Sequence, residues 1–314
     1  MSEPQAVRFG IYVPQVGYSY QRMLEVALRV EQAGLSSLWL YDHLYSPGQP
    51  DHDSFEGWTL ATALLAQTTT LRVGHLVLNA NFRHPVLLAR MCSTLDVISR
   101  GRLNIGLGSG SYQPEHEEGG FPWGPLSERS ARLAEGLEIL TRMFEGARTT
   151  FQGTYYQVNG VPNLPTAVQR PRPAIYVGGV GAKYTLPLVA RHANHWNLPT
   201  YGLAKWDSAT ADLDRECHRI GRDPDSLGRS LEAVMAVGQE DAGAREAVAT
   251  ATRRYAGEGW GLDAGGLVGT PAQVSRAIRK WMGRGFTEFV FFLADRGRGQ
   301  MLDLLVEEVL PQLR

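Results

Sequence analysis

Short apolar runs alternate with longer amphipathic stretches along the whole of this 314-residue chain. The short runs are rich in β-branched and aromatic residues, as buried strands are, whereas the longer stretches repeat their apolar residues every three or four positions, as helices do. This alternation predicts βα units around a parallel sheet. The predicted strands are residues 7–13, 37–41, 72–78, 103–107, 174–177, 195–197, 231–237 and 288–293. Eight strands alternating with helices predict one closed (β/α)8 TIM barrel, a single domain over residues 1–314.

Helices are expected between these strands, and several have recognisable ends. Gly34 and Gly101 follow helical patterns at positions where a left-handed residue commonly ends a helix. Thr270-Pro271 has the form of an N-cap followed by proline at the first helical position. The expected helices are residues 20–33, 86–98, 128–145, 184–191, 206–220, 242–256, 271–283 and 300–309.

Two insertions interrupt the alternation after the fourth predicted strand. The first, residues 111–125, follows the strand directly and contains Gly119-Gly120, three prolines and Trp123. The second follows the next helix and contains a predicted hairpin over residues 150–158, around Gln152-Gly153. A segment directly after a barrel strand overhangs the mouth of the barrel, so the first insertion is a candidate lid or substrate wall. The alternative is a surface loop that contacts no ligand.

Charge and cysteine usage favour small-molecule chemistry in a reducing compartment. The formal net charge is -1 with basic residues scattered along the chain, so no electrostatic footprint for nucleic acid or a membrane surface is present. No apolar stretch is long enough to predict a membrane span. Cys92 and Cys217 are isolated, and the histidines lack metal-ligand spacing, so neither a disulfide framework nor a metal site is expected. Without a recognisable secretory signal, a cytoplasmic location is predicted.

The second predicted strand ends in two ionisable residues, Asp42 and His43. Ligands of parallel α/β proteins bind at the carboxyl ends of strands, so these side chains are candidate catalytic groups. In that interpretation His43 is an acid, a base or a hydrogen-bond donor, and Asp42 fixes its tautomer or charge. The alternative is a polar strand end in which Asp42 begins a turn and His43 lies on the surface.

Other strand ends carry glycine or amide groups suited to a flat, anionic ligand. Gly108, Ser109 and Gly110 leave room for a ring, although close packing would also explain the glycines. The strand ending at Val177 continues into Gly178-Gly179-Val180-Gly181 before a helix, where free amides could hold a phosphate; the alternative is a tight turn without an anion. Asn79 offers a donor and an acceptor to the edge of a ring, while helix capping is preferred for Asn81 and His84.

Three segments together resemble the luciferase-like monooxygenase superfamily, and more closely its deazaflavin (coenzyme F420)-dependent oxidoreductases. The resemblance is strongest over residues 7–197 and looser through Gly269-Thr270-Pro271 to the C-terminal helix. The segments that carry it are Trp39-Leu40-Tyr41-Asp42-His43, the stretch from Arg83-His84-Pro85 through Thr94–Arg102 to Gly106-Leu107-Gly108-Ser109-Gly110, and Tyr176-Val177-Gly178-Gly179-Val180-Gly181 leading to Ala193-Asn194-His195-Trp196-Asn197.

The resemblance implies a barrel whose mouth binds the tricyclic ring, with His43 at the reacting face and Asp42 beside it. It implies a non-prolyl cis peptide at Leu76-Val77 behind the ring and a contact from Asn79. The residues that would line the cofactor or hold its phosphate are Gly108, Ser109, Gly110, Val177, Gly178, Gly179, Val180 and Gly181. The substrate pocket is expected to include Pro14, Tyr41, Tyr112 and Trp123.

The activity that the resemblance implies is hydride transfer between C5 of coenzyme F420 and a small organic substrate, with His43 handling the proton. Sugar-phosphate oxidation is disfavoured. The tryptophan that follows the Asp-His pair in the sugar-phosphate dehydrogenases of this family is replaced by Leu44-Tyr45-Ser46-Pro47, and Ser111 occupies the place of their catalytic glutamate. The alternatives are an FMN-dependent monooxygenase and a non-catalytic flavin-binding barrel. The resemblance also favours a homodimer.

Overall fold

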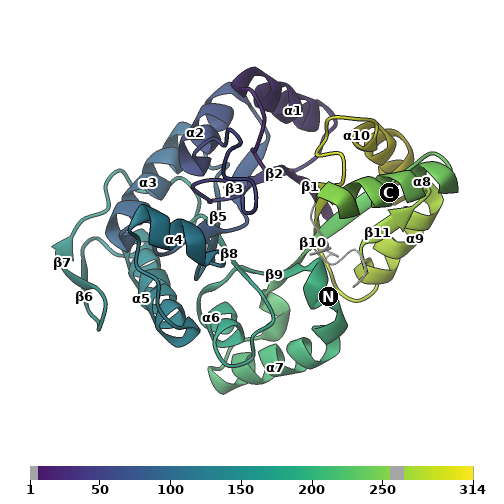
Figure 1. Cartoon of the computed structure of the whole chain (residues 1–314). Coiled ribbons are helices and arrows are strands. Elements are labelled where there is room, and N and C mark those ends of the chain that lie inside the picture. Colours follow the sequence, from purple (N-terminus) through teal and green to yellow (C-terminus); the bar gives the residue numbers. More distant parts are fainter. Residues whose placement is uncertain (1–5, 255–264, 314) are drawn as a thin grey trace.

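A ring of parallel strands forms the centre of the computed structural model, which describes residues 6–254 and 265–313. The sheet runs in the order β3-β2-β1-β12-β10-β9-β8-β5-β4, and β11 pairs with β10. Val73 of β3 also pairs in parallel with Leu103 beside β5, which brings the two ends of the sheet together (Figure 1). The strands are β1 Arg8–Tyr12, β2 Ser37–Leu40, β3 Arg72–His75, β4 Leu78–Asn79, β5 Asn104–Gly108, β8 Ala174–Gly178, β9 His195–Pro199, β10 Gly228–Val237, β11 Leu267–Gly269 and β12 Glu288–Leu293.

The predicted (β/α)8 TIM-barrel architecture is confirmed, with two differences in the strands. The third predicted strand is divided into β3 and β4 by a cis peptide bond between Leu76 and Val77, the position that the family resemblance implied. The short strand β11 was not predicted, because its three residues fall within a glycine-rich segment without alternation. The sixth predicted strand, residues 195–197, is present as β9.

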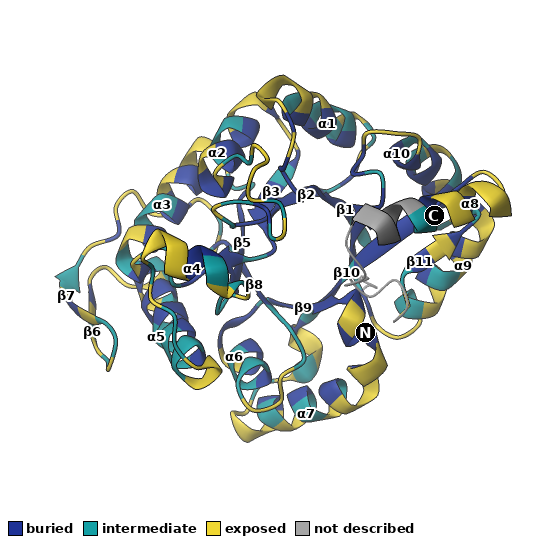
Figure 2. Cartoon of the chain, in the orientation of Figure 1, coloured by how far each residue is buried: buried dark blue, intermediate teal, exposed yellow. Residues whose placement is uncertain are grey.

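Helices surround the barrel, and Figure 2 shows their outer surfaces exposed while the strands are buried. The predicted start of one helix agrees in detail, since Thr270 caps α9 and Pro271 is its first residue. The predicted end of the helix at residue 256 lies outside the described residues. The helices are α1 Tyr20–Gln32, α2 Gly57–Gln67, α3 Pro85–Ile98, α5 Leu126–Glu145, α6 Thr185–His192, α7 Trp206–Arg219, α8 Asp241–Arg254, α9 Pro271–Met282, and α10 Met301–Leu304 continued by the π-helical turn η3 Leu305–Val309.

Helix α2 was missed because it lacks an amphipathic pattern. Apolar residues are distributed around much of its circumference, and Trp58, Leu60, Ala61, Leu64 and Leu65 are all buried. A periodicity of 3.6 residues is weak in a helix that is packed on several sides. Its start is nevertheless well defined, because the Glu56 carboxylate accepts hydrogen bonds from the backbone N–H groups of Trp58 and Thr59.

Both predicted insertions are present. The first contains a short helix, α4 Gln113–Gly119, and the second contains the antiparallel hairpin β6 Thr149–Gln152 and β7 Gln157–Val161. The hairpin projects from the outer edge of the barrel (Figure 1). Within the described residues, no helix has both the length and the apolar character needed to cross a bilayer.

The interior of the barrel is divided into an apolar layer and a polar layer. The polar layer lies at the amino ends of the strands, where Arg8 forms an ion pair of 3.0 Å with Glu288 and the Tyr176 hydroxyl donates to the same carboxylate at 2.8 Å. His195 stacks on Tyr176 with ring centroids 4.3 Å apart. The apolar layer comprises Tyr12, Trp39, Tyr41, Leu76, Tyr176, Val234, Val290 and Phe292. This filled interior forms the floor of a cavity at the carboxyl ends of the strands.

Candidate active site

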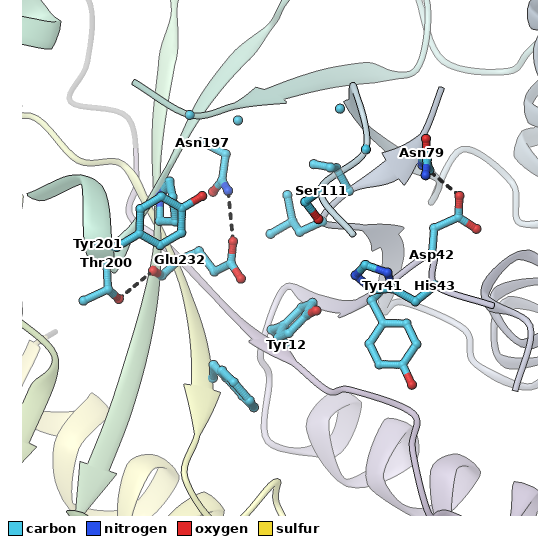
Figure 3. A pocket seen from close by; sticks show the side chains of 18 of the residues that line it. Tyr12, Tyr41, Asp42, His43, Asn79, Ser111, Asn197, Thr200, Tyr201 and Glu232 are labelled. Carbon is cyan, nitrogen blue, oxygen red and sulfur yellow. Dashed lines mark hydrogen bonds between the residues drawn. The ribbon is translucent and has the colours of Figure 1, made fainter. Parts of the chain in front are cut away.

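A cavity of about 290 Å³ opens at the carboxyl ends of the barrel strands. Barrel enzymes bind their substrates at this end, since the loops that follow the strands converge there. Figure 3 shows the two walls of the cavity facing each other, one around His43 and one around Glu232. The lining residues are Tyr12, Tyr41, Asp42, His43, Leu76, Val77, Asn79, Gly108, Ser109, Gly110, Ser111, Gly178, Gly179, Asn197, Pro199, Thr200, Tyr201, Glu232, Val234 and Phe292.

His43 directs one ring nitrogen toward a buried carboxylate. Its Nδ1 lies 2.8 Å from Oε1 of Glu115, a side chain of α4 that is fully buried. The other carboxylate oxygen of Glu115 accepts the backbone N–H of Leu44 at 2.9 Å. In the tautomer with a proton on Nδ1, His43 donates to Glu115 and leaves Nε2 for a ligand, because no partner of Nε2 is present among the described residues.

The structure corrects the expected partner of His43. Asp42 accepts two hydrogen bonds from the Arg83 guanidinium, at 2.7 and 2.9 Å, and one from the backbone N–H of Asn79 at 2.8 Å. Its carboxylate therefore joins the ends of β2 and β4, and Glu115 takes the role against His43 that the sequence interpretation gave to Asp42. A bidentate pair of this kind has a fixed geometry, which makes Asp42 a positioning residue for the strand ends.

Asn79 is held in place by contacts within the protein. Its Nδ2 lies 2.7 Å from Nε2 of His116, and its Oδ1 accepts the backbone N–H of Asn81 at 3.1 Å. Nδ1 of His116 lies 2.9 Å from the carbonyl oxygen of Pro122, so the consistent tautomer donates to that carbonyl and accepts from Asn79. Both polar ends of the Asn79 side chain thus have protein partners, while Asn79 also lines the cavity, so its contact with a ring stays a prediction. The preferred capping role of His84 is present, because His84 accepts the N–H of Val86 at the start of α3.

Glycines of β5 are required by the bulge around the cis peptide. A Cβ atom at Gly106 would lie 2.0 Å from the backbone oxygen of His75, and a Cβ at Gly108 would lie 2.5 Å from Cγ2 of Val77. Distances this short are excluded by van der Waals repulsion. Leu76, Val77, Gly108, Ser109 and Gly110 consequently form one continuous wall of the cavity.

The second glycine segment is only partly available to a ligand. Gly178 and Gly179 line the cavity, and Gly179 has a left-handed φ of +115°. The N–H of Gly179, however, donates to the carbonyl oxygen of Asn197 at 3.0 Å, which corrects the expectation that this amide is free to hold a phosphate. Val177, Val180 and Gly181 are not among the described residues that line the cavity.

Of the four residues expected in the substrate pocket, Tyr41 lines the cavity. Its hydroxyl is held 2.6 Å from Oγ of Ser54. Pro14, Tyr112 and Trp123 are not among the described lining residues. Tyr112 lies near the His43 ring, with centroids 6.4 Å apart, whereas Trp123 packs against Arg129, whose guanidinium carbon lies 3.8 Å from the centre of the indole.

The wall opposite His43 was missed by sequence reasoning. It is formed by Asn197 of β9, by Thr200 directly after β9, by Glu232 and Val234 of β10, and by Phe292 of β12. A charged residue within the otherwise apolar pattern of the predicted strand 231–237 was the available signal for Glu232. The signal for Glu115 was weaker, because the acidic run of α4 resembles an ordinary solvated face. Among the described residues, no group of His, Cys, Asp or Glu side chains is arranged to hold a metal ion.

Comparison with known proteins shows that the chain is similar to deazaflavin enzymes. The chain is 28% identical to an F420-dependent glucose-6-phosphate dehydrogenase of Beutenbergia cavernae, over 98% of each chain. It is 27% identical to an F420-dependent hydroxymycolic acid dehydrogenase of Mycobacterium tuberculosis, over 78% of this chain and 67% of the other.

Solved structures share the fold at lower identity. An F420-dependent secondary alcohol dehydrogenase in complex with an F420-acetone adduct superposes with a TM-score of 0.82 at 17% identity, covering 98% of this chain and 99% of the other. Long-chain alkane monooxygenase also has a TM-score of 0.82, at 17% identity, covering 99% and 92% of the two chains. The model of the family described as luciferase-like monooxygenase matches residues 7–288. The chain therefore belongs to the luciferase-like monooxygenase family.

Proposed function

We propose that this protein is a coenzyme F420-dependent oxidoreductase that transfers a hydride between the cofactor and a small organic substrate. The observation that carries the proposal is the His43-Glu115 pair, which leaves Nε2 of His43 at the wall of a cavity beside the cis peptide Leu76-Val77. The F420-dependent dehydrogenases that match most of the chain support the cofactor assignment.

The lining of the cavity suits a flat ring. Four lining residues are glycines, namely Gly108, Gly110, Gly178 and Gly179, so backbone atoms can approach a ligand closely. The floor consists of apolar and aromatic side chains, including Tyr12, Leu76 and Phe292. Such a site places an aromatic ring system against apolar surface and leaves a few polar groups to orient it. When bound, the deazaflavin supplies the chemistry of hydride acceptance and donation at C5.

The contribution of the chain is proton transfer at a defined atom. In the oxidation of an alcohol, Nε2 of neutral His43 accepts the proton of the hydroxyl group while the hydride leaves the carbon atom that bears this hydroxyl. In the reverse direction the imidazolium returns the proton to the carbonyl oxygen. The Glu115 carboxylate, 2.8 Å from Nδ1, stabilises the positive ring. Asp42 and Arg83 hold the segment that carries His43 through their bidentate ion pair.

Cofactor titration tests this function directly. The protein contains seven tryptophans, so their fluorescence can be followed as oxidised F420 or FMN is added. We expect F420 to bind more tightly than FMN, and we expect the bound deazaflavin to be reduced by a suitable alcohol. Tight FMN binding without F420 binding would favour the monooxygenase alternative. Binding without turnover over a broad set of alcohols and ketones would favour the non-catalytic barrel.

Three properties of the whole protein belong to the same proposal. We expect residues 1–314 to unfold as a single domain, the protein to form a homodimer as the family resemblance favours, and its location to be the cytoplasm. Cys92 and Cys217 are both buried and unpaired, which suits a reducing compartment. Calorimetry, light scattering and cell fractionation test the three properties in turn.

A further inference from the structure

The carboxylate of Glu232, in the wall opposite His43, has one hydrogen-bond partner among the described residues. Oε2 of Glu232 accepts from Nδ2 of Asn197 at 3.2 Å (Figure 3). The backbone around Glu232 is fixed by Thr200, whose hydroxyl donates to the Glu232 carbonyl oxygen and accepts the N–H of Val234, both at 3.0 Å. Glu232 is therefore held in place by its strand, while its carboxylate remains directed into the cavity.

No cationic side chain among the described lining residues balances this carboxylate. The described residues that line the cavity include no lysine and no arginine, and the other lining carboxylate, Asp42, is already paired with Arg83. Burial raises the pKa of Glu232 to about 7, although the hydrogen bond from Asn197 acts in the opposite direction. Unpaired charge in such a place is costly, so a ligand that brings positive charge would be stabilised there.

The groups around Glu232 favour a ligand that donates hydrogen bonds. Oδ1 of Asn197 is buried and has no hydrogen-bond partner among the described residues, so a second acceptor lies beside the carboxylate. The same cavity is also lined by the aromatic rings of Tyr12 and Phe292, which pack edge to face with centroids 5.3 Å apart. A protonated amine carries donors and no acceptor, and its charge interacts favourably with aromatic faces.

We infer that Glu232, together with Asn197, forms a substrate subsite for a protonated amine. Building on the proposed function, the compound oxidised or reduced at His43 is then an amino alcohol or amino ketone, with its ammonium group at Glu232 and its reacting carbon at His43. A phosphorylated sugar is disfavoured by the same wall, because its negative charge would meet Glu232 with no lining cation to offset it.

Three probes with the same three-carbon skeleton and a secondary hydroxyl test the subsite. They are 1-amino-2-propanol, 1,2-propanediol and glycerol 3-phosphate, whose remote groups are positive, neutral and negative. Calorimetric titration into the F420-loaded protein at pH 7 should give at least roughly tenfold tighter binding of the amine than of the diol, and the weakest binding for the phosphate. Equal affinity for amine and diol would overturn the inference.

Proton release gives a second readout that does not depend on turnover. Because the pKa of Glu232 is about 7, the carboxyl group is close to half protonated at pH 7, and an ammonium ligand favours the ionised form. Titrations in two buffers of different ionisation heat should therefore show release of about half a proton with the amine and none with the diol. Uptake of a proton, or no change, would contradict an ammonium at Glu232.

The variant Glu232→Gln keeps the shape of the side chain and removes its charge. It should lose the preference for the amine by roughly tenfold or more, and the proton release should disappear. The matched control is Glu25→Gln, at an exposed ion pair of α1 that is not part of the cavity lining. Retention of the amine preference in Glu232→Gln would refute the subsite.

The wild-type protein alone provides a test that is independent of folding of the variant. Between pH 6 and pH 8 the amine probe remains protonated while Glu232 ionises, so affinity for the amine should rise relative to affinity for the diol. The other titratable lining groups are Asp42, His43 and three tyrosines, Tyr12, Tyr41 and Tyr201. Loss of positive charge at His43 would change the affinity for the amine in the same direction as ionisation of Glu232, so a constant ratio of the two affinities across this pH range would refute the subsite. If F420 does not bind, the proposed function fails; repeating the titrations on cofactor-free protein then still decides the subsite.

Discussion

The Glu115 carboxylate lies 2.8 Å from Nδ1 of His43, although the two residues are separated by 72 positions in the sequence. The contact joins the end of β2 to the short helix α4 of the first insertion. It fixes which nitrogen of the imidazole faces the cavity, and it places a negative charge where the ring becomes positive. The insertion that the sequence suggested as a lid thus contributes a charged partner to the proposed proton-transfer group.

Glu115→Gln should lower kcat by roughly 10- to 100-fold while the affinity for F420 remains nearly unchanged. The glutamine preserves shape but no longer stabilises the imidazolium by charge. The ¹⁵N chemical shifts of the His43 ring should report a change in tautomer population, which a general loss of packing would not produce selectively. Glu117→Gln, on the same short helix and paired only with Gln113 among the described residues, is the control. An unaltered kcat in Glu115→Gln would exclude the positioning role.

His43→Ala should reduce kcat by about 10²- to 10⁴-fold, the range typical of the loss of a general acid or base. Tryptophan fluorescence should show that F420 still binds, because the ring contacts come from several other strand ends. Turnover at the wild-type rate would remove His43 from the chemistry. Loss of F420 binding together with turnover would instead assign it to cofactor binding.

Gly108→Ala should weaken F420 binding by roughly tenfold or more, because the new methyl group would lie 2.5 Å from Cγ2 of Val77 and displace the cavity wall. Val77→Ala removes the methyl group that collides, so the double variant should regain part of the lost affinity. The measurement is a double-mutant cycle of F420 dissociation constants. Strict additivity of the two changes would show that the contact does not shape the site.

The sequence was sufficient to predict the barrel because its strands are buried on both faces and most of its helices bury one face only. Such elements carry strong local patterns, and the carboxyl ends of the strands converge wherever a parallel barrel forms. This logic brought His43, Gly108 and Gly178 to one cavity, where the structure places them. It failed for α2, whose burial on several sides erases the periodicity.

Pair contacts could not be predicted in the same way. The choice between Asp42 and Glu115 as partner of His43 depends on the path of the first insertion and on Arg83, which engages Asp42. Neither the path of the insertion nor the pairing of Arg83 produces a periodic pattern in the sequence. Glu232 was included within a predicted strand, but its environment is created by β9 and the residues that follow it, which lie far away in sequence. Local sequence patterns therefore predicted where the site lies, but they did not predict which charged side chains contact each other there.

His195→Gln should change how stability depends on pH. Burial, together with the positive charges of Arg8 and Arg72, lowers the pKa of His195 to about 3, whereas an unfolded histidine titrates near pH 6.5. The unfolded wild-type chain therefore binds one more proton than the folded protein as the pH falls from 6.5 toward 3, and the folded state loses about 1.4 kcal/mol per pH unit from this group. Chemical denaturation at pH 6.5 and pH 5 should show wild type losing about 2 kcal/mol more than His195→Gln over that interval.

Glu232, whose pKa is raised, titrates over the same interval with the opposite sign, but it is present in both proteins and cancels in the comparison. His52→Gln, at an exposed position, is the control and should follow wild type. Parallel pH dependences for wild type and His195→Gln would mean that His195 is not held neutral in the polar layer. The conservative glutamine can still accept from Arg8, whose guanidinium nitrogen lies 3.3 Å from Nε2 of His195, so the difference reports the buried titration rather than a lost contact.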